Sequence, residues 1–322
     1  MEKILLFKKR NLGETIGTAF ELMRVNFRLI SVSFLIMVMP LLLLTIGLVS
    51  MGIVGLAKQK LTYIAGNSVP SSFNRIIASI GYFGYLFTLF VEAVVLHEAV
   101  IAYEHSHDPG NIKVSDVWAL IKSDLGRIIS SFLGLIPLAL LMGISTYFIY
   151  TIGSSISSSA TGLSILLIYL LYIYINTCMS NYLMLRLRSE YSVFTAVSKC
   201  ISLTVGKGRW WRTLGVHFVT TLVAFSFYSV SLIPFGVILY VFFAHQASLI
   251  ARDQALSYYY LIIGIGISYA GVIFAYCLNL VLLGSTANYY SLVEEKEHVG
   301  LQINIGNIGV NSELAKNQEG EY

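Results

Sequence analysis

The chain contains a stretch of 58 residues, Ile128 to Leu185, that includes no Asp, Glu, Lys or Arg. About 20 apolar residues in a helix are enough to cross the hydrocarbon core of a bilayer, so this stretch is long enough for two crossings. The Ser- and Gly-rich segment 153–162 lies between them. We therefore predict two transmembrane helices here, over residues 128–153 and 162–185.

The composition extends this conclusion to the whole chain. Of its 322 residues, 56% are hydrophobic and only 12% are charged, and the mean hydropathy is +0.75. A soluble domain carries about 25% charged residues, and a disordered chain combines low hydrophobicity with high charge. Both classes are excluded, which leaves an all-α, polytopic membrane protein.

Four further apolar stretches complete a set of six predicted spans. Each is long enough to cross a bilayer, and the second is interrupted by only a few ionisable residues. The six spans are predicted over residues 29–57, 76–103, 128–153, 162–185, 213–244 and 257–291. Residues 1–293 then form a single transmembrane domain, and residues 294–322 form a polar tail.

The distribution of basic residues orients these spans. Of the 21 Lys and Arg residues, 17 fall on the side of the N-terminus and 4 on the opposite side. Lys and Arg concentrate in cytoplasmic loops. The first ten residues hold only four apolar residues in a row, which is too short for the core of a signal peptide. We expect both termini in the cytoplasm and the chain in a bacterial cytoplasmic (inner) membrane.

A short amphipathic segment precedes each odd-numbered span, over residues 11–28, 114–127 and 192–207. In each, apolar residues recur at steps of three and four, and Lys or Arg accompanies them. This pattern is typical of a helix that lies in the membrane surface, although ordinary cytoplasmic loops with some helix would also explain it. Asn11 and Glu14 have the spacing of a capping box.

Proline follows the same threefold pattern. Pro40, Pro137 and Pro234 lie in the three odd-numbered spans, and the even-numbered spans have none. Proline removes a backbone hydrogen bond and bends a helix. We therefore predict an internal repeat that consists of a surface helix, a bent span and a straight span.

The openings of two of these segments resemble a known family. They are Gly-Glu-Thr-Ile-Gly-Thr-Ala-Phe at residues 13–20 and Tyr-Ser-Val-Phe-Thr-Ala-Val-Ser-Lys at residues 191–199. With the threefold pattern, they resemble the membrane domain fused to some bacterial glycerophosphoryl diester phosphodiesterases. Residues 290–301 are similar to the tail of uncharacterised six-span membrane proteins of Bacteroidota. The resemblance implies a fold and a membrane location. It does not imply an enzyme, because the phosphodiesterase catalytic domain has no counterpart here.

Polar residues inside the spans are the first candidates for a site. Glu92 lies 12 residues before Glu104, about 18 Å along a helix and so near mid-depth. An ionisable group at that depth is a functional-site hypothesis by default. With Asn176, Asn279 and His217, it could line a polar cavity open to the cytoplasm. Alternatively, these side chains could only form hydrogen bonds that fix the packing between helices.

A polar stripe on the fourth span accompanies these candidates. Tyr169, Tyr172, Asn176 and Ser180 follow one another at steps of three and four, so they share one face of a helix.

A basic and aromatic cluster lies just before the fifth span. It consists of Lys207, Arg209, Trp210, Trp211 and Arg212. Trp and Arg at this position predict an anchor at the membrane surface, and the alternative is a binding site for an anionic lipid headgroup.

The end of the second span is rich in possible metal ligands. His97, His105 and His107 are weak candidates, with Glu98 and Glu104 nearby. Two ligands on one helix need a spacing of four residues, whereas His97 and Glu104 are seven apart, about 10.5 Å. We predict no metal ion, no cofactor and no catalytic residue.

Three functional classes remain. The first is a non-catalytic scaffold, accessory or regulatory subunit of the membrane. The second is a transporter or lipid-handling protein with a polar midplane site around Glu92, and the third is an intramembrane metal-dependent hydrolase. The expected partners are membrane lipids and proteins that bind the C-terminal tail. Nucleic acid is not expected, because the chain has no basic soluble domain.

Overall fold

The computed structural model describes residues 3–64, 72–106, 111–189, 191–206, 208–246 and 252–299. All regular elements in these ranges are helices, and six helices are long and apolar enough to cross a membrane. The predicted class, an all-α multi-pass membrane protein, is confirmed. The elements are α1 (Leu12–Val25), α2 (Phe27–Ser33), the π-helical turn η1 (Phe34–Val38), α3 (Met39–Ile64), α4 (Ser72–His105), α5 (Val114–Ser123), α6 (Leu125–Ile156), α7 (Ser158–Met179), α8 (Tyr182–Arg188), α9 (Val193–Thr204), α10 (Arg209–Gln246) and α11 (Arg252–Glu297).

Three short helices alternate with pairs of spans. Helix α1 precedes the continuous span of α2, η1 and α3 and then α4; α5 precedes α6 and the α7–α8 span; α9 precedes α10 and α11. The short helices end earlier than predicted, and the spans begin almost at once. Asn26 alone separates α1 from α2, and Asp124 alone separates α5 from α6, because each backbone N–H closes the preceding helix and the chain then turns directly into the next.

The predicted capping box at the start of α1 is confirmed. Glu14 N donates to Asn11 Oδ1 at 2.9 Å, and Asn11 N donates to Glu14 Oε2 at 3.0 Å. At the start of α5, the carboxylate of Asp116 accepts from Lys113 N at 2.9 Å. An acidic side chain in the first turn satisfies one of the free N–H groups there and complements the helix dipole.

The first proline lies where a wider helical turn ends. In η1, Met39 N donates to Phe34 O, five residues back. Pro40 follows directly; it has no N–H, and its ring crowds the carbonyl four residues before it. A π-helical turn relieves such crowding without ending the helix. Pro137 and Pro234 lie inside α6 and α10, as predicted.

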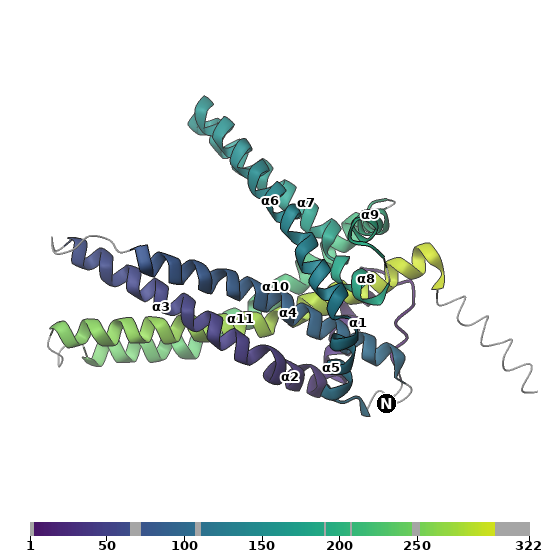
Figure 1. Cartoon of the computed structure of the whole chain (residues 1–322), viewed down its shortest axis with the longest axis horizontal. Coiled ribbons are helices and arrows are strands. Elements are labelled where there is room, and N and C mark those ends of the chain that lie inside the picture. Colours follow the sequence, from purple (N-terminus) through teal and green to yellow (C-terminus); the bar gives the residue numbers. More distant parts are fainter. Residues whose placement is uncertain are drawn as a thin grey trace, which may run out of the picture.

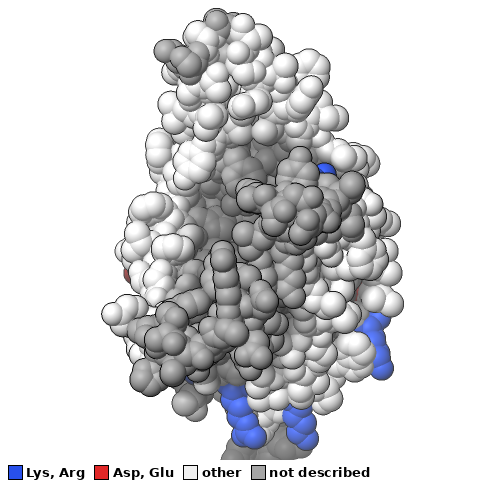
Figure 2. All heavy atoms as spheres, turned by 90° about the vertical axis from the view of Figure 1, so that its left-hand side faces the viewer, with Lys and Arg blue, Asp and Glu red and all other residues white. Residues whose placement is uncertain are grey.

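The spans diverge from a common end (Figure 1). Helices α3, α4, α10 and α11 extend side by side away from this end, whereas α6 and α7 leave it together as a hairpin that points elsewhere. The short helices α1, α5, α8 and α9 gather at the end from which both groups depart. We call this end, together with the last turns of α4 and α11, the hub. Figure 2 views the molecule from the far ends of the four aligned spans. The visible described surface is almost entirely uncharged there; most of the visible Lys and Arg lie towards its lower and right-hand edge, and one small patch lies within the outline.

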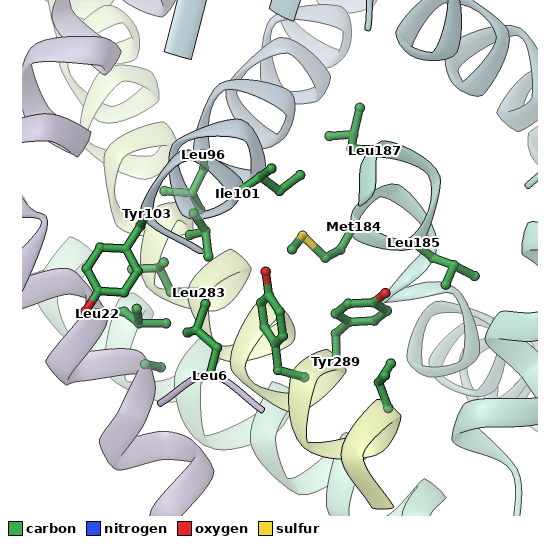
Figure 3. Packing of buried hydrophobic residues seen from close by; sticks show 14 of the residues in the cluster. Leu6, Leu22, Leu96, Ile101, Tyr103, Met184, Leu185, Leu187, Leu283 and Tyr289 are labelled. Carbon is green, nitrogen blue, oxygen red and sulfur yellow. The ribbon is translucent and has the colours of Figure 1, made fainter. Parts of the chain in front are cut away.

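The largest hydrophobic core lies in the hub (Figure 3). Leu22 of α1, Tyr103 of α4, Met184 of α8 and Tyr289 of α11 are all fully buried. Burying a large apolar side chain contributes about 1.5–3 kcal/mol. The hub therefore joins segments that are far apart in the chain.

The last span continues beyond its predicted end. Helix α11 runs to Glu297, so residues 292–297 are helical, although the polar tail was predicted from residue 294. Glu295 pairs with Arg212 at 2.8 Å, and Glu297 pairs with Lys199 at 2.6 Å. These ion pairs with α10 and α9 hold the charged last turn against the hub. The remainder of the predicted tail, from residue 300, lies outside the described residues.

Candidate functional site

Glu92 lies in the middle of α4 and is only 2% exposed. It lines a small cavity with Ser33 at the end of α2 and Asn279 of α11, beside η1. The volume is about 10 Å³, enough for one water molecule. Neither carboxyl oxygen of Glu92 has a hydrogen-bond partner in the described part of the chain, and neither has Ser33 Oγ. Three polar side chains therefore meet at a space of the size of one water.

Only two of the four predicted midplane residues come together. Glu92 and Asn279 share this cavity. His217 Nε2 instead lies 3.4 Å from Ser285 Oγ, where α10 packs on α11. Asn176 is exposed and belongs to the diverging α6–α7 hairpin. Asn176 lies beside Ala93 on another side of α4, whereas Glu92 faces Ser33 and Asn279.

A second pocket lies between α4 and the hairpin, and we call it the His97 pocket. Its volume is about 300 Å³. Tyr172, Asn176 and Ser180 of the predicted polar stripe line it, whereas exposed Tyr169 does not. His97 Nδ1 lies 2.5 Å from Ala93 O, and its buried Nε2 has no partner among the residues that the structure describes. The pocket is lined by Phe90, Ala93, His97, Leu135, Met142, Tyr172, Ile175, Asn176, Met179, Ser180, Tyr182, Leu183 and Leu282.

A larger pocket opens on the other side of α6, and we call it the apolar pocket. Its volume is about 750 Å³, and α4, α5, η1 and α6 enclose it. Phe132 makes ring contacts with Phe87 and Phe90, each with centroids 5.2 Å apart. Trp118 of α5 also lines the pocket, and Lys122 Nζ lies 5.4 Å from the centre of its ring. The lining residues are Ile36, Met37, Phe87, Phe90, Val91, Val94, Val95, Val114, Ser115, Trp118, Ile121, Leu125, Ile128, Ile129, Phe132 and Leu133.

The predicted basic and aromatic anchor forms the first turn of α10. Arg212 faces the hub, where it donates to Arg10 O at 3.1 Å and pairs with Glu295. Trp210 contacts Tyr174 of α7, with centroids 5.9 Å apart, and Trp211 is 71% exposed. Arg209 Nη2 donates to Val205 O at 3.1 Å. Lys207 lies outside the described residues.

The metal candidates do not gather. His97 is buried in its pocket, and His105 is exposed at the end of α4. His107 lies outside the described residues. Among the residues that the structure describes, no group of three His, Cys, Asp or Glu side chains could hold a metal ion.

Sequence reasoning missed a polar network in the hub. Arg188 of α8 donates to both carboxylate oxygens of Glu104 at 3.0–3.2 Å, and Tyr290 OH donates to Glu104 Oε2 at 2.5 Å. The ring of Phe7 lies 4.6 Å from the Arg188 guanidinium. No local pattern marks these residues as partners, because they come from four separate parts of the chain.

The N-terminal segment, residues 3–10, passes through the hub as an ordered strap. Ile4 N donates to Tyr103 OH at 2.8 Å, and Leu6 is 5% exposed. Arg10 is buried, and its guanidinium donates to Leu6 O at 2.7 Å. Burial lowers the pKa of this guanidinium. The strap thus joins α4 to the other hub helices.

Comparisons of the chain with protein-family models, with curated proteins and with solved structures found no match.

Proposed function

We propose that this multi-pass membrane protein binds a membrane lipid, with an acyl chain in the apolar pocket. The observation that carries the proposal is a pocket of about 750 Å³ between helices that diverge, lined almost entirely by apolar and aromatic side chains. Ligand pockets commonly measure about 300–1,000 Å³ and are mostly apolar. In a bilayer, the acyl chains of lipids are the most abundant apolar ligands beside such a pocket.

The helix that carries Trp118 favours an anionic lipid. Lys122 of α5 lies over the ring of Trp118, whereas Asp116 in the first turn offsets the charge of Lys113. Trp is favoured at the level of lipid headgroups, and Lys near the surface attracts anionic lipids. An anionic phospholipid satisfies both ends of the site, because its chain is apolar and its headgroup is negative.

We also propose an orientation of the protein in the membrane, which the distribution of Lys and Arg supports. The hub lies at the cytoplasmic face of a bacterial inner membrane, and both ends of the chain are on that side. Helices α1, α5 and α9 lie in the membrane surface and open three repeats of one unit, as in the membrane domain that accompanies glycerophosphoryl diester phosphodiesterases. The α5 surface helix then presents Trp118 and Lys122 at headgroup depth.

Photo-crosslinking in vesicles tests the proposal. Ile129 lines the pocket and is 52% exposed, so benzoylphenylalanine at this position is expected to preserve the fold. In phosphatidylcholine vesicles with a minor fraction of phosphatidylglycerol, its lipid adducts should be enriched in phosphatidylglycerol. The matched control is the same change at Leu140, which lies on α6 outside the pocket and is 61% exposed. Adducts of equal composition at both positions would reject the proposal.

A second candidate is a scaffold or accessory subunit of the membrane. The diverging hairpin favours it, because it stands apart from the other four spans (Figure 1) and little of its most apolar part is buried, 6% in α6 and 17% in the α7–α8 span, as in α10 and α11. In this role, a transmembrane helix of a partner protein packs on the hairpin. Benzoylphenylalanine at Leu167, which is 57% exposed, would then yield a protein adduct in native membranes. Lipid adducts alone would count against this role.

A further inference from the structure

We propose that the His97 pocket binds the free hydroxyl group of a neutral lipid, which donates a hydrogen bond to His97 Nε2. The proposal extends the lipid-binding function above but depends on a different pocket. Of the residues that line the two pockets, only Phe90 is shared. Each site can therefore be tested while the other remains intact.

The hydrogen bond of His97 inside its own helix determines what Nε2 can do. Ala93 O can only accept, so the hydrogen between the two atoms must be on Nδ1 of His97. In the neutral ring, Nε2 then carries a lone pair and no hydrogen. His97 is 2% exposed, and this acceptor has no partner in the described part of the chain. A buried acceptor without a partner is costly, so a ligand that brings a donor is favoured.

The remaining lining selects the chemical class of that donor. None of the residues that line the His97 pocket is Lys, Arg, Asp or Glu. A carboxylate or phosphate would lose its hydration there without meeting a counter-ion. A hydroxyl group is neutral, and it can donate to His97 and accept from the exposed amide of Asn176.

The shape of the pocket explains why the hydroxyl should belong to a lipid. Met142 of α6, Ile175 of α7 and Leu282 of α11 supply apolar walls around the polar groups. The volume of about 300 Å³ is at the small end for ligand sites, which suits a polar head and the first part of a chain. The pocket lies between spans, where the rest of the chain can extend into the bilayer.

The experiment compares two probes that differ in one hydrogen-bond donor. Wild-type protein in nanodiscs is labelled with a long-chain primary alcohol that carries a diazirine, or with its methyl ether, and the adducts are mapped by mass spectrometry. The alcohol should label residues of α4 and α7 that line the pocket, about fivefold more than the ether, which corresponds to one hydrogen bond. Equal labelling by the two probes, or stronger labelling by the matching carboxylate, would overturn the proposal.

Variants then assign the effect to one atom. His97→Leu should abolish the preference for the alcohol, whereas His97→Gln, which keeps an acceptor, should retain part of it. His217→Leu is the matched control, since this histidine lies outside the pocket, and it should leave the preference unchanged. Leu133→Trp fills part of the apolar pocket and should also leave it unchanged. Loss of the preference in either control would refute a role specific to His97, and the wild-type comparison remains decisive if His97→Leu does not fold.

Discussion

Arg188 and Glu104 form a bidentate ion pair inside the hub, although 84 residues separate them in the chain. Tyr290 OH donates to the same carboxylate, so helices α4, α8 and α11 meet at one acidic group. Planar, bidentate pairs of arginine and carboxylate are among the stronger polar contacts in proteins. This network therefore connects the spans at the end where they diverge.

Glu104→Gln should destabilise the protein by about 3 kcal/mol, the low end of the range for buried pairs, since both side chains are partly exposed. The loss arises because Arg188 keeps its charge without an ionised partner. Denaturant unfolding in detergent micelles measures it. The control is Glu297→Gln, which breaks a more exposed pair and should cost less than about 1 kcal/mol. Equal losses in the two variants would contradict the importance of the network.

Tyr290→Phe should cost about 1–2 kcal/mol, because it removes one charge-assisted hydrogen bond and keeps the buried ring. The double variant Tyr290→Phe/Glu104→Gln should lose less unfolding free energy than the sum of the two single losses, since both changes remove the same contact. Unfolding of the four proteins in one detergent measures this coupling. Additive losses would show that the Tyr290 hydroxyl contributes independently of Glu104.

The N-terminal strap offers a matched pair of neighbouring leucines. Leu6 is 5% exposed in the hub core, and Leu5 is 61% exposed. Leu6→Ala should reduce the free energy of unfolding by about 2–4 kcal/mol, whereas Leu5→Ala should change it by less than about 0.5 kcal/mol. Thermal unfolding in micelles distinguishes them. Similar effects would mean that the strap does not pack as described.

Ser33→Ala should cost about 1 kcal/mol, because we expect one water to bridge Ser33, Glu92 and Asn279 in their shared cavity. Without such a water, removal of an unpaired hydroxyl would be neutral or stabilising. The unfolding free energy of the variant separates the two cases. Ser226→Ala is the control, since that hydroxyl is exposed on α10.

The ion pair between Lys199 and Glu297 should make stability depend on alkaline pH. The hydrogen bond to Glu297 raises the pKa of Lys199 above its usual value of 10.5. Its stabilising contribution is therefore complete below pH 10.5 and is lost as the pH rises through the folded-state pKa. Wild type should lose more stability than Glu297→Gln over that interval in parallel unfolding curves. Parallel losses would show that the pair contributes nothing.

Much of the fold was predictable because the evidence for it is local. The charge-free stretch of residues 128–185 and the similar runs around it predicted six spans, and the described part of the chain has six helices long and apolar enough to cross a membrane. Asn11 and Glu14 are neighbours on one helical turn, so their spacing alone predicted the capping box that the structure contains.

The candidate sites were only partly predictable. The steps of three and four from Tyr172 to Ser180 placed these residues on one face, and that face does line a pocket. The same reasoning wrongly grouped Asn176 with Glu92, because depth along a span does not show which side of a neighbouring helix a residue meets. Asn176 lies beside Ala93, and Glu92 faces Ser33 and Asn279. The partners of Glu104 were invisible for a related reason, since no local pattern links residues of α4, α8 and α11.

The sequence by itself determined which segments are apolar enough for the bilayer and how many helices can cross it. Hydropathy and helix length are properties of consecutive residues, so no tertiary contact is needed to predict them. Only the tertiary structure decided that α6 and α7 diverge from the other spans, that the apolar pocket and the His97 pocket open beside α4, and that Arg188 meets Glu104. These features depend on packing between residues far apart in the chain, where the shape of many side chains together selects one arrangement.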